Sequence, residues 1–379
     1  MINALLDRSH YPSLVDWVYL NQASLGLVGE PAVQAMQNFL NDVGRHGNLY
    51  MSDAEEVAFF DNLRQRGAKM FHCPAEQIAI LASASELLGQ LPFMLRPAAS
   101  SNIIAVATDF PAITRPWLRY AAEAGCEVRF VADVADVDLT DEVIGAMDGK
   151  TDVLALSYVQ FSTGTQVDVP RLRQACNAVG AKLVVDVTQA AGVLEIETAV
   201  WQADAIVSSG YKWLGGHGGV ALAALSPELS TQIPPLPGWM GTPDPFDFEA
   251  TALPVAAGGR RFTQSTMSYV SLVGLTAALD ELLALGEGQA EQHAFELAQR
   301  LIEGSGAYGW RPFRPLDDSA ASPHIITLTH PEHEIGAVVA GLRQQGVICG
   351  GRNGRLRISL APYNNSTDID AFISALASL

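Results

Sequence analysis

The chain has few lysines, few cysteines and no long apolar run, and each shortage narrows what the protein can be. Lysine makes up four of the 23 basic residues and arginine the other 19, against 41 acidic residues and a formal net charge of −18. Few cations are therefore available to neutralise phosphates, which argues against nucleic acid as a partner. The few lysines that do occur are expected to have specific places.

The four cysteines, Cys73, Cys126, Cys176 and Cys349, are widely spaced and form no C-x-x-C pair. That spacing predicts neither a zinc site nor a disulfide framework, and it favours free thiols in a reducing compartment. The N-terminal sequence lacks a basic start followed by an apolar stretch, and no apolar run approaches the length of a membrane span. We therefore expect a cytoplasmic protein that does not associate with a membrane.

Short apolar runs alternate along the chain with helical patterns, and 49% of the residues are hydrophobic, which is enough for a large core. This alternation predicts an α/β fold with a mostly parallel sheet flanked by helices, in which ligands bind at the carboxyl ends of the strands. The expected strands cover residues 77–81, 103–107, 127–130, 153–157, 183–186, 205–208 and 219–225, and the clearest helices cover 86–95, 114–124, 169–178 and 269–285.

The pattern changes after the helix that ends near Gly286. A Pro- and Gly-rich stretch at 234–259 is typical of loops, and the residues beyond Gly288 indicate a smaller α+β unit. We place a large domain at residues 16–286 and a small domain at residues 1–15 plus 287–379.

Lys212 lies in an apolar, glycine-flanked run, an unexpected place for a lysine that serves only solubility. Asp186 ends the strand-like run KLVVD 26 positions upstream, and Gln189 follows three residues later. Burial lowers the pKa of a lysine, so that its amine can form a Schiff base with an aldehyde cofactor and later carry a proton. An acid that faces a pyridine nitrogen keeps that nitrogen protonated. Lys212 and Asp186 together predict a site for pyridoxal 5'-phosphate (PLP), although each alone fits a buried strand end or a helix cap.

Ser83-Ala-Ser-Glu86 follows an expected strand and precedes an apolar helical run, which is the pattern of a capping box. A helix that starts at the carboxyl end of a strand offers N–H groups and a positive dipole to a phosphate. Ser209 and Tyr211 could add hydroxyl donors, but capping and core packing explain the same residue types. A nucleotide-binding enzyme is the alternative, but the sequence has neither its P-loop nor a strand-linked G-x-G-x-x-G.

Seven motifs in order resemble the class V aminotransferase family of fold-type I PLP enzymes, and the resemblance covers nearly the whole chain. They are S-A-S-E, D-F-P, S-Y-V-Q-F-S-T-G, V-D-V-T-Q-A, S-S-G-Y-K, R-F-T-Q-S-T and R-I-S-L-A-P-Y-N. The family includes cysteine desulfurases, selenocysteine lyases, kynureninases, isopenicillin N epimerase-like proteins and several transaminases. The resemblance implies the PLP cofactor, the fold-type I architecture and a homodimer.

The resemblance also implies roles for individual residues. Lys212 would bind PLP covalently, Asp186 would pair with the pyridine nitrogen, and Gln189 would approach the phenolic oxygen. The phosphate would be held by Ala84, Ser85, Ser209 and Tyr211, with Thr266 contributed by the other subunit of the dimer.

Arg357 matches the family arginine that binds the substrate carboxylate, for which a guanidinium offers a bidentate fork. The other residues expected on the substrate side are Asn21, Ala23 and Ser24 of the N-terminal segment, Trp239 and Arg352. For Arg352 the resemblance gives no definite role, and a core anchor explains Trp239 almost as well.

Two aromatic residues depart from the desulfurase pattern: Phe110 stands where desulfurases have a histidine, and Phe161 where they have an asparagine. A hydrocarbon ring can stack on a cofactor but cannot transfer a proton. Cys349 lies in an apolar stretch only eight residues before Arg357, so we interpret it as a buried small hydrophobe and not as a sulfur acceptor. These features favour kynureninase-like and epimerase-like members over desulfurases.

The sequence thus predicts a PLP-dependent enzyme that acts on an α-amino acid through a Schiff base and a Cα carbanion. The expected reaction is that of a C–S or C–C bond lyase, either cysteine lyase-like or kynureninase-like. An aminotransferase or an amino-acid epimerase of the same family stays open, as does a non-catalytic PLP-binding protein.

Overall fold

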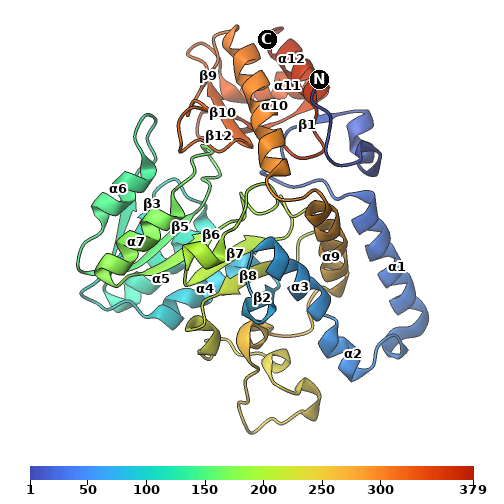
Figure 1. Ribbon diagram of the computed structural model, residues 1–379, viewed down its shortest axis with the longest axis vertical. Helices are drawn as coiled ribbons and strands as arrows, with labels where there is room; N and C mark the ends of the chain where they lie inside the picture. The colour runs from blue at the N-terminus through green and yellow to red at the C-terminus, as the bar shows by residue number, and fades with distance from the viewer.

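A seven-stranded sheet forms the centre of the computed structural model, which describes residues 1–379 apart from the side chain of Asn48 (Figure 1). The strand order is β2-β8-β7-β6-β5-β3-β4. The strands are β2 (Ile78–Leu81), β3 (Asn102–Val106), β4 (Glu127–Val131), β5 (Thr151–Ser157), β6 (Lys182–Asp186), β7 (Ala205–Ser209) and β8 (Ala221–Leu225).

The five strands β4, β3, β5, β6 and β7, which are adjacent in this order, pair in parallel with one another. Strand β8 runs antiparallel to both of its neighbours, β7 and β2. Every residue of β3 and of β8 is buried, because helices cover both faces of the sheet. The predicted α/β fold with a mostly parallel sheet is confirmed, and each expected strand begins and ends within two residues of the observed one.

The two faces of the sheet carry different helices. Alternate residues of each strand point to opposite faces, so that Val184 of β6 packs in one apolar cluster and Val185 in the other. Helices α4 (Ala84–Leu95) and α5 (Pro111–Ala124) contribute to the cluster of Val184. The opposite face is covered by α3 (Asp61–Met70), α6 (Leu139–Ala146), α7 (Val169–Val179) and α9 (Tyr269–Ala284).

Four helices were predicted, and their observed ends differ by three residues at most. The largest difference is at α5, which begins at Pro111 because proline suits the first position of a helix. Further helices of this part of the chain are α1 (Glu30–His46), α2 (Asp53–Ala58) and α8 (Thr198–Trp201).

The chain after α9 forms a second sheet with its own helices, drawn at the top of Figure 1 together with both termini. Its order is β12-β13-β10-β9, and all of its pairs are antiparallel. Its elements are α10 (Gln289–Gly306), β9 (Arg311–Pro312), β10 (Ile325–Thr329), α11 (Ile335–Gln344), β12 (Gly350–Arg352), β13 (Arg355–Ser359) and α12 (Ser366–Leu376). In addition, β1 (Val18–Tyr19) pairs in parallel with β11 (Val347–Ile348). The division into two domains at residue 286 stays a prediction.

The two sheets approach closely at Gly164, in the turn that follows β5. Its φ is +77°, and a Cβ built there would lie 2.0 Å from the carbonyl oxygen of Ile325 in β10. Only glycine permits this backbone contact. The turn after β5 is therefore held directly against the C-terminal sheet.

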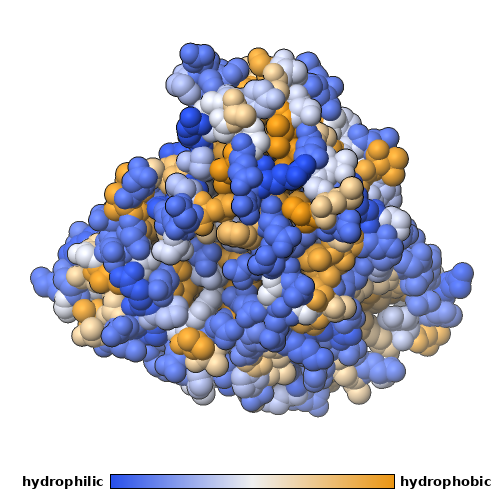
Figure 2. Space-filling view, turned by 45° about the horizontal axis from the view of Figure 1, so that its top comes forward, coloured by the Kyte–Doolittle hydropathy of each residue, from blue (hydrophilic) through white to orange (hydrophobic). Residues whose placement is uncertain are grey.

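The view in Figure 2 shows a largely hydrophilic surface with scattered hydrophobic side chains. Within the described residues no single helix is long and apolar enough to cross a bilayer, and only the bent pair α9 and α10 reaches that length and composition together.

Candidate active site

A cavity lies at the carboxyl ends of β5, β6 and β7, where the final residues Ser157, Asp186 and Ser209 meet. It is lined by Ser83, Ala84, Ser85, Phe110, Ala112, Ser157, Phe161, Asp186, Thr188, Gln189, Ser209, Tyr211 and Lys212. Eight of the nine residues predicted to face the cofactor are thus brought together from four different segments. The ninth, Thr266, does not line it.

Lys212 is the buried cation of this cavity, with 6% of its surface exposed. Its Nζ lies 5.2 Å from the centre of the Phe110 ring and 5.7 Å from that of Tyr211. Burial lowers the pKa of Lys212 to about 8, Asp186 opposes this shift, and the charges of Arg357 and Arg352 add to it. An amine with such a pKa is partly uncharged near neutrality, as a nucleophile or a base must be.

The main chain at Lys212 is fixed by the N-terminal segment. Gln22 Nε2 donates a hydrogen bond of 2.8 Å to the carbonyl oxygen of Lys212, and Gln22 Oε1 accepts one from the Tyr363 hydroxyl. Gly26 packs so close that a Cβ there would lie 2.4 Å from the same carbonyl oxygen. Gln22 was not predicted, because its role depends on contacts with residues more than a hundred positions away.

Asp186 is buried at the end of β6, and burial raises the pKa of its carboxyl, opposed by hydrogen bonds from Thr188 and by Lys212. Its Oδ1 accepts the backbone N–H of Thr188 at 2.8 Å. Thr188 Oγ1 in turn accepts the N–H of Ser209 at 3.0 Å. Thr188 thereby joins the ends of β6 and β7, a role that its place in the motif V-D-V-T-Q-A did not reveal.

The N-terminus of α4 forms another wall. Ser83 is its N-cap and accepts the Glu86 N–H at 3.2 Å, as predicted, but the Glu86 carboxylate accepts from Ala82 N–H at 2.8 Å instead of from Ser83. Ala84 and Ser85 occupy the first turn, whose N–H groups have no carbonyl of the helix to bind. These donors and the hydroxyls of Ser209 and Tyr211 suit an anionic group.

Gln189 is fixed by the groups around it. Its Nε2 donates to the carbonyl oxygen of Ala23 at 3.0 Å, and its Oε1 accepts from Trp213 Nε1 at 2.8 Å, so that one amide N–H remains for a ligand. The backbone carbonyl of Gln189 lies 2.5 Å from His324 Nε2. Burial lowers the pKa of His324 to about 4, so this histidine donates its N–H as a neutral ring.

Arg357 approaches the cavity from β13, with 1% of its surface exposed. Its Nη1 donates to the carbonyl oxygen of Phe161 at 2.7 Å, and its Nη2 to Ser24 Oγ at 2.5 Å. Arg352 Nη2 donates to the same hydroxyl at 3.1 Å. Burial and the neighbouring Arg352 lower the pKa of Arg357 to about 10. A buried guanidinium of this kind favours an anionic ligand.

Two polar atoms near Arg357 have no hydrogen-bond partner among the described residues: its own Nε and Asn21 Oδ1. Both lie around Gly350, where a Cβ would be 3.1 Å from Asn21 Oδ1 and 3.8 Å from Arg357 Nε. Buried polar atoms left unpaired cost about 1–3 kcal/mol each, so they indicate a place for a polar ligand.

Two predicted residues lie away from the cavity of their own chain. Thr266 is exposed just before α9, and Trp239 is 40% exposed in the short helical turn Trp239–Gly241, edge-on to Phe246. The adjacent loop also exposes large apolar side chains, namely Ile233, Leu236, Phe248 and Leu253. The roles of Thr266 and Trp239 stay predictions.

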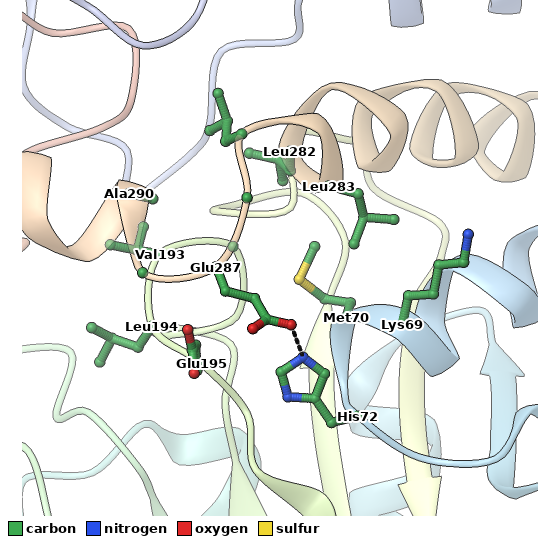
Figure 3. Close-up of a pocket in the computed structure, with 14 residues that line it drawn as sticks. Lys69, Met70, His72, Val193, Leu194, Glu195, Leu282, Leu283, Glu287 and Ala290 are labelled. Atoms are coloured by element: carbon green, nitrogen blue, oxygen red, sulfur yellow. Dashed lines mark ion pairs between the residues drawn. The ribbon is translucent and has the colours of Figure 1, made fainter.

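A larger cavity, of about 630 Å³, lies between α3, residues 192–195 and the junction of α9 with α10 (Figure 3). Its wall is mainly apolar, with Met70, Leu282 and Leu283, and a His72–Glu287 pair at 3.6 Å borders it. None of the predicted site residues lines it. Volume alone does not identify a site, whereas converging polar groups with shifted pKa values do so for the cavity at Lys212.

The profile of the family Aminotransferase class-V matches residues 18–372. The uncharacterized aminotransferase YcbU of Bacillus subtilis (strain 168) is 22% identical over 372 residues, which cover 98% of this chain and 96% of that protein. Cysteine desulfurase CsdA of Escherichia coli (strain K12) is 26% identical over 407 residues, 99% of this chain and 97% of that protein.

Among solved structures, a C-DES mutant with glycine covalently linked to its PLP cofactor has a TM-score of 0.88 at 21% identity, and the match covers 99% of this chain and 100% of that one. Several further curated relatives are named probable cysteine desulfurase. The kynureninase of Deinococcus radiodurans is 26% identical over 338 residues, 86% of this chain and 78% of that protein. Named relatives are thus mostly desulfurases, and they do not support the expected closer likeness to kynureninases and epimerases.

Proposed function

The chain belongs to the Aminotransferase class-V family, and on that basis we propose that it is a PLP-dependent enzyme acting on an α-amino acid. The observation that carries the proposal is Lys212, a buried amine whose pKa is lowered to about 8, in one cavity with the buried acid Asp186. A lysine of this kind is suited to bind an aldehyde covalently.

The donor groups of the cavity suit PLP at each of its polar ends. Lys212 would take the aldehyde, and Asp186 would face the pyridine nitrogen. The phosphate would be held by the first-turn N–H groups of α4 and by hydroxyls, from Ala84, Ser85, Ser209 and Tyr211. Gln189 has one amide N–H left for the phenolic oxygen.

When bound, PLP supplies an electron sink for negative charge at the substrate Cα. Arg357 would hold the substrate carboxylate, with Asn21 and Arg352 beside it, and so fix which Cα bond is broken. Lys212 Nζ would remove or return the proton at Cα. It is suited to this role because it is a buried amine 5.2 Å from the ring of Phe110, the residue proposed to stack on the cofactor. Phe110 would stack on the cofactor but could take no proton, and Asp186 would keep the pyridine nitrogen protonated.

Within the family, we propose a C–S or C–C bond lyase. C-DES is named a cystine C-S lyase, and the curated relatives include desulfurases and a kynureninase. Phe110 and Phe161 still argue for a kynureninase-like site. Cys349 is 7% exposed, and burial raises the pKa of its thiol to about 12, so it does not suit a sulfur acceptor. An aminotransferase, an epimerase and a non-catalytic PLP-binding protein are the alternatives that the test below separates.

We also propose a homodimer in which Thr266 reaches the phosphate site of the other subunit. The support is that Thr266 is exposed and outside the cavity of its own chain, next to a loop with exposed apolar side chains. Trp239 in the same loop would then border the substrate site.

The test is visible absorption of the purified PLP-loaded protein during titration with L-cysteine, L-cystine, L-kynurenine and L-alanine, with Lys212→Ala as the control. We expect a band that depends on Lys212 and shifts with one of these amino acids. Release of pyruvate from L-cysteine or L-cystine, or of anthranilate from L-kynurenine, would identify a lyase. A keto acid that keeps the carbon skeleton of its substrate, formed with loss of the band, would identify a transaminase, and racemised substrate an epimerase. Binding without turnover would indicate a binding protein. A protein that gives no Lys212-dependent band contradicts the proposal.

A further inference from the structure

Asp109 is a buried acid next to the cavity that the proposed chemistry does not use. It follows β3, stands one residue before Phe110 and is 6% exposed. The ion pairs among the described residues include none with Asp109, and its hydrogen-bond partners are all uncharged. Burial raises the pKa of its carboxyl to about 6, even though four hydrogen bonds act to lower it.

Each carboxylate oxygen of Asp109 accepts two hydrogen bonds. Oδ1 accepts the backbone N–H of Phe110 at 2.7 Å and the hydroxyl of Ser157 at 2.6 Å. Oδ2 accepts the backbone N–H of Ser157 at 2.7 Å and Gln160 Nε2 at 3.2 Å. Asp109 therefore joins the start of α5 to the end of β5 and to the turn that follows it.

The groups that Asp109 holds are those that shape one side of the cavity. Phe110, Ser157 and Phe161 all line it, and the rings of the two phenylalanines meet edge to face at 5.5 Å. Phe161 directly follows Gln160, and its carbonyl oxygen accepts the hydrogen bond from Arg357. The Asp109 carboxylate thus connects the phenylalanine rings beside Lys212 with the Phe161 carbonyl, which holds Arg357.

The fold opposes the ionisation of Asp109. A carboxyl whose pKa is raised in the folded state stabilises the fold below its unfolded pKa, near 3.8, and that contribution is lost as the pH rises through about 6. At neutral pH the ionised Asp109 therefore stabilises the fold less than the protonated acid would. What its carboxylate does provide is the set of four hydrogen bonds that joins the segments around the cavity.

We infer that Asp109 is a positioning residue, which sets Phe110, Phe161 and, through the Phe161 carbonyl, Arg357 relative to Lys212. The inference rests on the proposed PLP function. It goes beyond that function because one residue, Asp109, would orient both the cofactor ring and the substrate carboxylate without contacting either of them.

The test variant is Asp109→Asn. Whichever way the amide is turned, its NH2 group faces a backbone N–H, that of Phe110 or that of Ser157, so one of the two main-chain hydrogen bonds is lost. Two quantities are measured on PLP-loaded protein: the visible circular dichroism per bound PLP, and the dissociation constant for glycine from the shift of the absorption band. Glycine is the probe because it has a carboxylate and no side chain.

We expect the variant to bind PLP but with a visible dichroism at least about twofold smaller, since the ring loses its fixed wall. We expect the glycine dissociation constant to rise about tenfold, as for one lost hydrogen bond to a charged group. Asp109→Asn in a Phe110→Leu background should reduce the dichroism less than it does alone, because the two residues act through the same wall.

Asp204→Asn is the matched control. Asp204 is likewise buried, and it accepts a strand N–H, that of Leu183 at 2.8 Å, but it lies at the opposite ends of β6 and β7. That variant should lose thermal stability and keep the dichroism and the glycine affinity of the wild type. Ser157→Ala is the milder second variant: it removes only the hydroxyl bond and should change the dichroism in the same direction.

The outcomes separate the two claims. A wild type without a Lys212-dependent band contradicts the PLP proposal itself. A wild type that binds PLP, with Asp109→Asn equal to it in both measurements, overturns the positioning role. If Asp109→Asn does not fold, the Ser157→Ala variant decides, and wild-type dichroism there also overturns the inference.

Discussion

Arg352 and Arg357 donate to one hydroxyl, Ser24 Oγ, at 3.1 and 2.5 Å. Two guanidiniums so close repel each other, which is part of the reason that the pKa of Arg357 is lowered to about 10. The chain has 41 acidic residues and a net charge of −18, but the group that the two arginines share is uncharged. This indicates that a ligand supplies the negative charge that would offset their repulsion.

Arg357→Lys is expected to weaken glycine binding about 100-fold, because a lysine cannot provide the bidentate fork to a carboxylate. Arg352→Gln should weaken it less, about tenfold, because Arg352 is more exposed and is not held by Phe161. Spectral titration of the PLP-loaded variants measures both. Equal losses would contradict the assignment of Arg357 as the main carboxylate anchor.

The rate at which the apoprotein captures PLP should depend on pH through Lys212. With the pKa lowered to about 8, the amine is protonated and unreactive below that pH, so the rate should rise about tenfold per pH unit up to 8 and then level off. Stopped-flow absorbance between pH 6 and 9 measures it, with Lys212→Arg as the unreactive control. A rate that still rises about tenfold per pH unit at pH 9 would show that the pKa of the lysine is not lowered.

Cys349→Ser should leave turnover within about twofold of the wild type, because the thiol is buried and its pKa is raised to about 12. Steady-state rates with the best amino acid, at equal PLP content, measure the effect. Loss of activity with PLP retained would restore a sulfur-accepting role to this residue.

Asp133→Asn should lower the free energy of unfolding by about 3 kcal/mol, since it removes the buried carboxylate partner of the Arg314 guanidinium and leaves only the partly exposed Asp318. Asp133 Oδ1 lies 3.2 Å from Arg314 Nη2, with the two side chains 0% and 3% exposed, and Thr163 and Thr165 also donate to it. The exposed pair Arg300–Asp370 is the control, for which Asp370→Asn should cost at most about 1 kcal/mol. Urea denaturation compares them, and similar losses would show that burial of the first pair has no special weight.

Mixing the variants Lys212→Ala and Thr266→Ala tests the shared site. In a mixed dimer, one site would combine an intact Lys212 with an intact Thr266 from the other subunit, and PLP affinity should recover there. The other site would lack both groups. Equilibrium dialysis after exchange of subunits should find wild-type affinity at about half of the sites of the mixed dimers. If PLP affinity does not recover, Thr266 acts only within its own subunit and the site is not shared.

The sequence predicted the sheet and the cofactor side of the cavity because these depend on local patterns. Strand ends can be located from apolar runs; Asp186 and Ser209 lie at such ends, and Lys212 follows three residues after Ser209. Gln22 and His324 were not predicted, because each reaches the site through tertiary packing with residues far away in the sequence. Ser24 was expected near the substrate, but its hydrogen bonds with Arg352 and Arg357 were not. Asp109 is the first residue of the motif D-F-P, but its burial and its four hydrogen bonds could not be foreseen from spacing.

The hydrogen bond between Ser24 and Arg357 joins residues 333 positions apart. Chains are synthesised from the N-terminus, so Lys212 and Asp186 leave the ribosome well before β13 and Arg357. A product cut short anywhere before β13 would therefore contain the proposed cofactor-binding lysine without the proposed carboxylate-binding arginine.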